Sequence, residues 1–268
     1  RDVTGVQTCA LPIYDLTGSN LDYVRRAFGN LFGQFLNEDS TIELEQIGNS
    51  YLFHTGFDFG FLNSASIYDG DRAILEQIIE KVGSWKVKNS VALAGAGLAH
   101  ANYLKERGYI PSHATPFMVA VVDSRFDDFQ LREGLVAKRT ETPEDCAINK
   151  KMLAETFGMA EQWVEILFNT SFGFPSIYRY MLYDNGVPVS SCLFITQGDF
   201  VGCFDVVTPV AHQRKGYGAE LMKFMMKEQA EIGSRLIALQ SSQAGQKLYR
   251  TLGFQVVEYQ QQWKMSTV

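Results

Sequence analysis

The sequence contains no apolar stretch long enough to span a bilayer, and no apolar segment typical of a secretory signal is visible. We therefore expect no membrane partner and take the cytoplasm as the location. The four cysteines show no CxxC or other paired spacing, and the four histidines are scattered without carboxylate or cysteine neighbours. We expect neither disulfides nor a metal site. The cysteines are Cys9, Cys146, Cys192 and Cys203.

Length and composition are those of an ordinary globular protein. With 268 residues, 46% hydrophobic and 20% charged, the chain exceeds the usual size of one domain, so two modest domains are expected. The net charge of −6 disfavours nucleic acid as a partner, because a phosphate backbone would be repelled. It is compatible with a cationic amine as substrate.

The chain does not begin with methionine. Residues 1–13 resemble translated sequencing-adapter read-through of the kind found in metagenomic assemblies. We expect them to be a non-native leader and leave them out of the fold argument.

A short segment with two glycines predicts an anion-binding loop. It spans residues 213–218 and lies between an apolar run, 203–208, and an amphipathic segment that starts at Tyr217. Glycines let the backbone turn tightly and approach a ligand, while the first turn of a helix offers unpaired N–H groups and a positive dipole end. Phosphate is the natural ligand. No Gly-Lys-Ser/Thr ending and no third glycine follow, which excludes a P-loop and a dinucleotide turn.

This segment resembles motif A of the GNAT superfamily of N-acetyltransferases, Gln/Arg-x-x-Gly-x-Gly/Ala after the fourth strand. Gln213, Gly216 and Gly218 match the fixed positions. Residues 239–254 resemble motif B, with a strand, a short helix ending in Leu-Tyr and a Gly-Phe that opens the last strand. The proline usual in the loop after the fourth strand stands one place early, at Pro209.

The resemblance implies acetyl-CoA as co-substrate, without a metal, in a cleft where the fourth and fifth strands separate. The thioester arm would pair with the fourth strand, as a surrogate for a missing strand neighbour. The diphosphate would meet the loop and the helix start. The implied backbone contacts are Val206, Val207 and Thr208, and the implied loop contacts are Gln213, Arg214, Lys215, Gly216, Tyr217, Gly218 and Ala219.

Two residues are candidates for catalysis. Tyr249 lies close to the family position of the residue that hydrogen-bonds the CoA sulfur and protonates it; the alternative is a packed aromatic side chain. Asp205, on the fourth strand, is a candidate general base, and strand alternation predicts that Phe204 and Val206 point away from it. Glu161 and Glu165, one helical turn apart, could instead attract a cationic acceptor; the alternative is a solvated helix face.

The acceptor pocket of this superfamily is built from its first two helices and their connections, here residues 157–180. This stretch is rich in aromatic residues, which either wall a planar amine or form core and interface. Cys203 and His212 are interpreted as a buried apolar residue and a loop residue, since direct attack on a thioester needs no acyl-enzyme. The large apolar side chains of this stretch are Phe157, Met159, Trp163, Phe168, Phe172, Phe174, Tyr178 and Tyr180.

The pattern from residue 135 onwards gives the element order of a GNAT domain. A helix is expected from Pro143, capped by Thr142, to about Phe157, and a hairpin turn at Asn185-Gly186. The expected strands are 135–139, 177–183, 187–196, 200–208, 236–241 and one from 254, and the other expected helices are 161–169, 217–232 and one that ends at 252.

The first part of the chain resembles a degenerate copy of the second. Residues 102–109 match 247–254 in shape, after a predicted strand at 57–65 and a helix at 71–82. The loop between this strand and this helix has one glycine and two carboxylates, Asp69 and Asp71, which would repel a diphosphate. Leu104 takes the place of Tyr249. This half is therefore predicted to be catalytically silent.

These observations predict an α/β fold with a mixed sheet and two tandem GNAT-like domains, 14–128 and 129–268, joined by a linker around 123–134. The resemblance implies an N-acetyltransferase that moves an acetyl group from acetyl-CoA to a primary amine of a small molecule, such as an antibiotic or metabolite, by direct attack. The alternatives are a non-catalytic acyl-CoA sensor and an aminoacyl-tRNA-dependent ligase. A monomer or a homodimer is expected.

Overall fold

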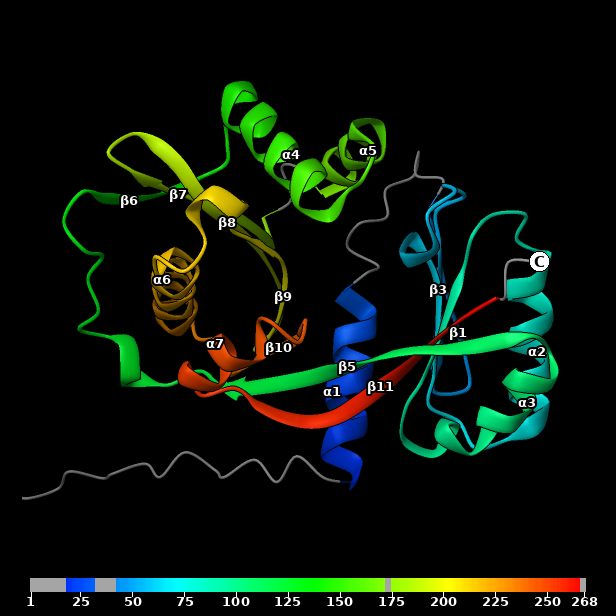
Figure 1. Cartoon of the computed structure of the whole chain (residues 1–268). Helices are drawn as coiled ribbons and strands as arrows, with labels where there is room; N and C mark the ends of the chain where they lie inside the picture. The colour runs from blue at the N-terminus through cyan, green and yellow to red at the C-terminus, as the bar shows by residue number, and fades with distance from the viewer. Residues whose placement is uncertain (1–17, 32–41, 172–174, 266–268) are drawn as a thin grey trace, which may run out of the picture.

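The computed structural model describes residues 18–31, 42–171 and 175–265, so the predicted leader at residues 1–13 lies outside the described residues. Eleven strands form one sheet in the order β1-β2-β3-β4-β11-β5-β10-β9-β8-β7-β6 (Figure 1). The first elements are α1 (Gly18–Leu31), β1 (Glu43–Ile47), β2 (Ser50–His54), the 3-10 helix η2 (Gly60–Leu62), β3 (Asn63–Ile67), α2 (Arg72–Ser84), β4 (Ser90–Leu93), η3 (Gly95–His100), α3 (Ala101–Glu106), β5 (Tyr109–Val121) and η4 (Ser124–Phe126). They are followed by β6 (Leu135–Arg139), α4 (Pro143–Phe157), α5 (Glu161–Ser171), β7 (Ile177–Asp184), β8 (Val187–Gln197), β9 (Phe200–Val207), η5 (Val210–His212), α6 (Tyr217–Glu231), β10 (Leu236–Gln240), α7 (Gln246–Thr251) and β11 (Gln255–Met265).

The predicted element order from residue 135 onwards is confirmed, because local signals fix most boundaries. Thr142 caps α4 by accepting a hydrogen bond from the Asp145 N–H, and Pro143 occupies the first turn. The helix ends at Gly158, whose φ of 64° is the left-handed conformation that glycine adopts without strain. The predicted mixed α/β sheet is confirmed as well.

Two long strands, β5 and β11, join the two halves of the molecule. β5 pairs with β10 through its C-terminal part, with Leu236 opposite Val121 and Gln240 opposite Phe117. β11 pairs with β5 along most of its length and also with β4, where Gln261 lies opposite Leu93. Figure 1 shows both strands crossing between the halves. Separating the halves would therefore break backbone ladders as well as side-chain contacts.

The predicted strand at 57–65 is wrong in position, because β3 runs over 63–67 and a turn with η2 precedes it. The cause is the fully buried Asn63. Its Nδ2 donates to the carbonyls of Phe57, Phe59 and Lys88 at 2.6, 3.2 and 2.9 Å. Its Oδ1 accepts from the Thr55 N–H at 3.0 Å. One side chain thus satisfies loop backbone that would otherwise require a strand partner.

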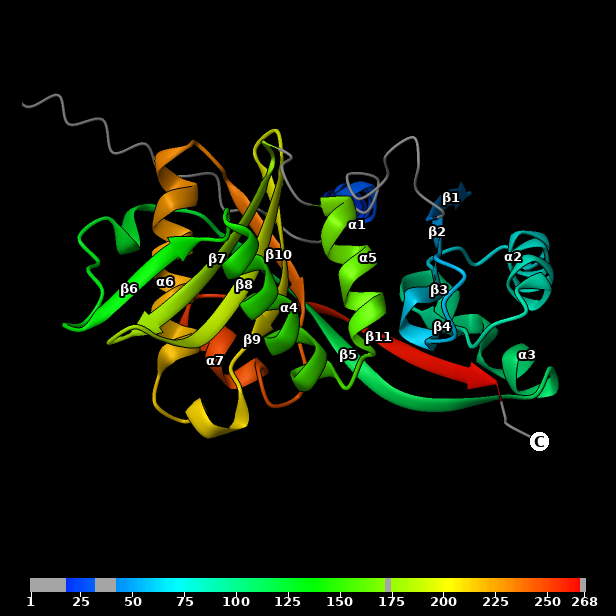
Figure 2. The same cartoon turned by 90° about the horizontal axis from the view of Figure 1, so that it is seen from above.

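Different helices cover the two faces of the sheet in the C-terminal half. On β10, Ile237 and Leu239 belong to the core cluster that contains α6 and α7 residues, while Leu236 and Ala238 pack with α1. Helices α4 and α5 form a further cluster with β7 and the end of β9. Figure 2 shows α1 and α5 between the two halves. The second face is thus covered partly by a helix from the beginning of the chain.

No helix in the described part of the chain is long and apolar enough to cross a membrane.

Candidate active site

The strands β9 and β10 separate at the centre of the C-terminal half. They pair in parallel over three positions only, from Phe200 opposite Leu236 to Gly202 opposite Ala238. Beyond these, β9 continues beside β8 as far as Val207, while β10 continues beside β5. The facing edges of the two strands thus leave backbone groups without a strand partner, and an extended ligand with amide groups could take that place.

Asp205 stands at an irregularity of β9 on the separating segment. Its φ of 50° is left-handed, and the register with β8 shifts between Phe204 and Val207. Phe204 stacks on Phe28 of α1, and the Asp205 carboxylate accepts a hydrogen bond from Arg179 of β7 at 3.2 Å. The expectation that Phe204 points away from Asp205 is therefore wrong, because the bulge turns both toward the face that carries α1, α4 and α5.

The three residues predicted to contact the cofactor by backbone lie where the strand ends. Val207 is the last residue of β9, and its carbonyl accepts a hydrogen bond from the Ser190 hydroxyl at 2.8 Å. The Thr208 carbonyl accepts a hydrogen bond from the side-chain amide of Gln213 at 3.0 Å. Gln213, a fixed position of the predicted motif, thus ties the loop to the strand end. The cofactor contacts of Val206, Val207 and Thr208 stay a prediction.

The predicted anion-binding loop leads directly into α6. Arg214 and Gly216 have φ values of 63° and 85°, and Gly216 is the N-cap residue of the helix. Within the described residues, no side chain accepts from the N–H groups of Tyr217, Gly218 or Ala219. The first turn therefore presents free N–H groups and the positive end of a 15-residue helix to an anion.

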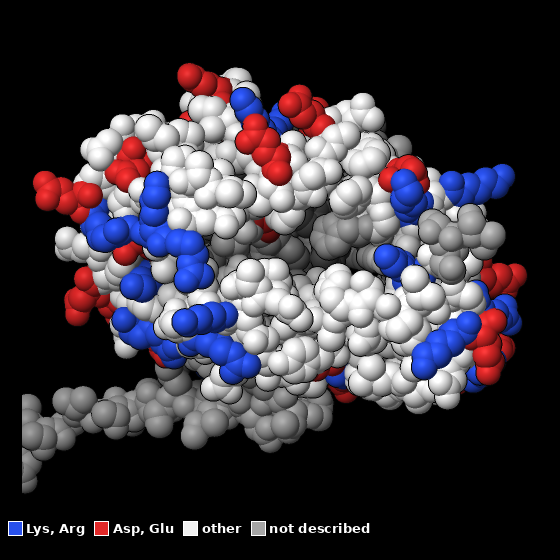
Figure 3. Space-filling model, viewed as in Figure 1, with Lys and Arg blue, Asp and Glu red and all other residues white. Residues whose placement is uncertain are grey.

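Arg132, from the linker, supports this loop and was not among the predicted site residues. Its guanidinium donates to the Lys215 carbonyl at 3.2 Å and pairs with Glu220 of the first turn of α6 at 3.3 Å. The linker's charge pattern was the only signal in the sequence. Lys and Arg side chains gather over α6 and α7 in Figure 3, and Arg214 and Lys215 of the loop are exposed. The basic surface suits phosphate groups despite the negative net charge.

Tyr249 lies on α7 in the same core cluster as Cys203 and is 8% exposed. Its ring meets Phe254 edge-on with centroids 5.7 Å apart. Burial raises the pKa of its phenol above the ordinary value of 10. Its hydroxyl makes no hydrogen bond to any residue that the structure describes. The phenol is thus held protonated with its donor unused. Its contact with a CoA sulfur remains a prediction.

Cys203 and His212 do not form a nucleophile pair. Cys203 is buried, and burial raises the pKa of its thiol well above the usual range, which disfavours the reactive thiolate. His212 lies in η5, where its ring meets that of Tyr217 with centroids 6.3 Å apart. The interpretation of Cys203 as a buried apolar residue and of His212 as a loop residue is confirmed.

A small pocket lies between helices α4 and α5 and the bulge of β9. It is about 30 Å³ in volume and is lined by Leu153, Phe157, Met159, Val164, Phe168, Arg179 and Asp205. Figure 3 shows the face in view hollowed between α4 and α5 above and α7 and β5 below. Three of the predicted large apolar residues, Phe157, Met159 and Phe168, thus line a pocket rather than only the core. Phe172 and Phe174 lie outside the described residues.

The remaining predicted acceptor residues do not line this pocket. Tyr178 and Tyr180 pack against the core cluster of α6, and the Tyr180 ring lies 5.6 Å from that of Phe224. Trp163 of α5 contacts Phe59 of the first half, with ring centroids 5.6 Å apart, so one aromatic residue forms interface. Glu161 is exposed, and Glu165 pairs with Lys150 of α4 at 2.6 Å. The two glutamates do not line the pocket.

The corresponding region of the first half is closed. β3 and β4 pair in parallel from Ser64 opposite Ser90 to Ile67 opposite Leu93, and the Ala94 N–H continues the pairing by donating to the Ile67 carbonyl at 3.0 Å. A Cβ at Gly97 would lie 2.3 Å from that same carbonyl oxygen. The strands therefore do not separate, and η3 packs directly on the strand end where a cofactor arm would need to lie.

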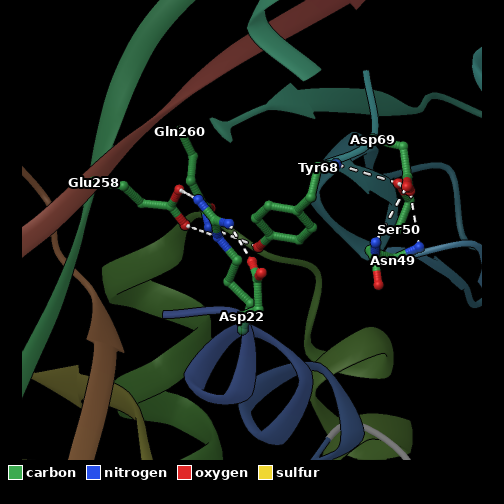
Figure 4. Close-up of polar contacts among 8 residues, drawn as sticks. Asp22, Asn49, Ser50, Tyr68, Asp69, Glu258 and Gln260 are labelled. Carbon is green, nitrogen blue, oxygen red and sulfur yellow. Dashed lines mark hydrogen bonds and ion pairs between the residues drawn. The ribbon is translucent and has the colours of Figure 1, made fainter. Parts of the chain in front are cut away.

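The two carboxylates of the loop after β3 already accept hydrogen bonds from the chain's own donors, and one of them lies at the start of α2. Asp71 caps α2 by accepting from the Ala73 N–H at 2.7 Å. Asp69 accepts from the Asn49 N–H at 2.8 Å and from the Ser50 hydroxyl at 2.7 Å (Figure 4). The first turn of α2 is thus already bound by a carboxylate of the chain itself. These residues do not fit a diphosphate.

A polar network after β3 fixes the first half against α1 and β11. The hydroxyl of Tyr68 accepts a hydrogen bond from Gln260 at 2.9 Å (Figure 4). The Arg25 guanidinium lies 5.0 Å from the centre of the Tyr68 ring. Arg25 also pairs with Glu258 of β11 at 2.5 Å. Gln260 in turn accepts from Gln240, the last residue of β10, at 2.6 Å. Side chains of both halves thus meet beside the end of β10.

Comparison with known proteins agrees with this geometry. Residues 176–256 match the family model of the acetyltransferase (GNAT) domain. A GCN5-related N-acetyltransferase from Kribbella flavida has a TM-score of 0.69 at 17% identity, covering 91% of this chain and 96% of that one. Another from Sphaerobacter thermophilus has a TM-score of 0.60 at 14% identity, covering 91% of each chain. No curated protein matches the chain by sequence.

A two-domain relative covers the same length. A tandem GNAT protein from the clavulanic acid biosynthesis pathway has a TM-score of 0.54 at 15% identity, covering 93% of this chain and 89% of that one. Such distant likeness shows the fold. Residues 176–256 thus match the GNAT acetyltransferase domain, and the chain as a whole has the fold of a two-domain GNAT structure. The family uses an acyl-CoA as acyl donor, and the predicted resemblance is confirmed.

Proposed function

We propose that the chain is an acetyl-CoA-dependent N-acetyltransferase for a primary amine of a small molecule, with its single active site in residues 129–268. The observation that carries the proposal is the coincidence of two unfilled features in that part of the chain. The edges of β9 and β10 separate after three paired positions, and the start of α6 beside them offers free N–H groups. Residues 14–128 form a companion domain whose equivalent features are filled.

The chain's own residues would divide the work as follows. The first turn of α6 and the basic loop would hold the diphosphate, with Arg132 fixing the loop. Bound acetyl-CoA would supply an activated acetyl thioester. The amine, after losing a proton to the Asp205 carboxylate or to water, would attack the thioester carbon and the CoA thiolate would leave, so no side chain needs to carry the acetyl group. Tyr249 would donate a hydrogen bond to the sulfur as the carbon–sulfur bond breaks.

The test is a calorimetric titration with acetyl-CoA, using two matched variants. Gly216→Asp places a carboxylate in the anion site, and we expect it to abolish binding of one acetyl-CoA per chain. Gly233→Asp is the control. Gly233 follows the other end of α6 with a φ of 86°, against 85° at Gly216, and a Cβ there would meet no atom within 4 Å. Both variants thus carry the same charge and similar backbone strain.

Binding that survives Gly216→Asp, or two sites per chain, would contradict the proposed site. Turnover is measured separately, as release of the CoA thiol in the presence of primary amines. Binding of one acetyl-CoA without thiol release from any amine would identify a sensor rather than an enzyme.

A further inference from the structure

The pocket lined by Asp205 and Arg179 indicates which class of amine the protein accepts. This inference rests on the proposed function. We propose that this pocket binds the ammonium group of an acceptor whose amine is attached to an apolar carbon chain or ring and has no carboxylate beside it. Asp205 is the residue that binds the cation.

The two charged groups of the pocket differ in what they offer to a ligand. The Arg179 side chain is 8% exposed, and its guanidinium lies 4.5 Å from the Phe168 ring and donates to Asn149 at 3.4 Å. The Asp205 side chain is 35% exposed. Both side chains line the pocket, and the Asp205 carboxylate is the more exposed of the two charged groups, so a ligand reaches it more readily than the guanidinium.

Asp205 has an oxygen available for a second cation. Arg179 donates to Oδ2, whereas Oδ1 accepts no hydrogen bond from any described residue. An ammonium carries three N–H donors and no acceptor, which suits a carboxylate oxygen that still has free lone pairs. Arg179 would hold the carboxylate in place while the second oxygen binds the acceptor.

The walls of the pocket select the remainder of the acceptor. Its other lining residues, Leu153, Phe157, Met159, Val164 and Phe168, are all apolar. A hydroxyl or carboxylate on the carbon next to the amine would lose its water without gaining a partner there. At about 30 Å³ the pocket has room for two or three water-sized groups, enough for the amine and the first carbons.

The location of the pocket fits a role in the reaction. Asp205 belongs to the segment of β9 that separates from β10, immediately before the strand end predicted to hold the thioester arm. An amine bound to Oδ1 would thus approach the cleft from the face that carries α4 and α5, opposite the face of α6 and α7. Donor and acceptor would enter from different sides.

The experiment measures binding to the CoA-loaded protein by calorimetry, so that it does not depend on turnover. The probes are 2-phenylethylamine, its carboxylate-bearing analogue phenylalanine, the neutral 2-phenylethanol and the polar amine glucosamine. We expect 2-phenylethylamine to bind at least about tenfold more tightly than each of the other three. Asp205→Asn should weaken its binding by about tenfold to a hundredfold, the loss typical of a hydrogen bond to a charged group, without changing that of 2-phenylethanol.

Glu155→Gln provides the control. Glu155 is an exposed carboxylate of α4 outside the pocket, 3.9 Å from Lys151, and its loss should change neither ligand's affinity. Unchanged affinity for 2-phenylethylamine in Asp205→Asn, or equal affinity for phenylalanine or glucosamine, would overturn the proposal. Acetylation of glucosamine but not of 2-phenylethylamine would overturn it while the proposed function stands. Binding that depends on the ammonium charge, without any acetyl transfer, would support the proposed ammonium site and refute the proposed acetyltransferase function.

Discussion

Replacing Tyr249 by phenylalanine separates a catalytic role from a packing role. A reference phenol and thiol differ by about 1.5 pKa units, so full proton transfer from tyrosine to a thiolate is uphill by about 2 kcal/mol. Burial raises the pKa of Tyr249 further, which makes transfer less favourable still. Its contribution should therefore be a hydrogen bond to the developing thiolate, worth about 1.5–3 kcal/mol, and kcat should fall by about tenfold to a hundredfold.

The same substitution should not destabilise the fold. The Tyr249 hydroxyl has no partner among the described residues, so its removal should leave the midpoint of thermal unfolding unchanged or slightly raised. The affinity for acetyl-CoA should also persist. Because the phenol must be protonated to donate and its pKa is raised, the wild-type pH profile should show no loss from this group up to about pH 10. An unchanged kcat in Tyr249→Phe would refute the reasoning, and so would a large drop in stability.

Two further predictions concern the core. Gly202→Ala should lower the free energy of unfolding by about 1–3 kcal/mol, measured by thermal or urea unfolding, because the added Cβ would lie 2.3 Å from the Leu31 Cδ1. Gly83→Ala is the control and should not destabilise the fold, because its Cβ would meet no atom within 4 Å. Equal stability of the two variants would contradict the packing of α1 on β9. Cys203 should resist alkylation in the native protein and react after unfolding, measured by peptide mass spectrometry, because burial raises the pKa of its thiol. Rapid alkylation of Cys203 in the native protein, with loss of activity, would contradict this prediction and indicate that Cys203 is a reactive nucleophile.

The sequence predicted the C-terminal half well because its signals are local. A cap at Thr142, a proline in the next position and the turn at Asn185-Gly186 act over a few residues, and the structure has the elements where they indicate. The conformation of the predicted anion-binding loop was likewise predictable, since glycine at a left-handed position before an amphipathic helix is a property of consecutive residues. The prediction that the first half is catalytically silent came from the carboxylates of its loop and from Leu104 in the place of Tyr249.

The sequence did not predict features that depend on distant partners. Alternation along β9 failed at Asp205, because a bulge is set by the strands on either side and leaves little trace in a single strand. In the sequence Arg132 lies in the predicted linker, and only the fold brings it to the Lys215 carbonyl. Strand 57–65 was misplaced because the buried Asn63 binds backbone groups of two other segments of the chain, residues 55–59 and Lys88.

The sequence by itself thus determined the resemblance to the GNAT superfamily, the element order from residue 135 onwards and the glycine loop before α6, since these depend on neighbouring residues and on short motifs. Tertiary structure decided how the halves are joined, with β5 placed between β10 and β11 and α1 packed on the second half. It also decided that the strands separate at β9 and β10 but not at β3 and β4, and that Asp205 and Arg179 share one pocket. The physical reason is that strand pairing and burial join residues far apart in the chain, for which periodicity carries no signal.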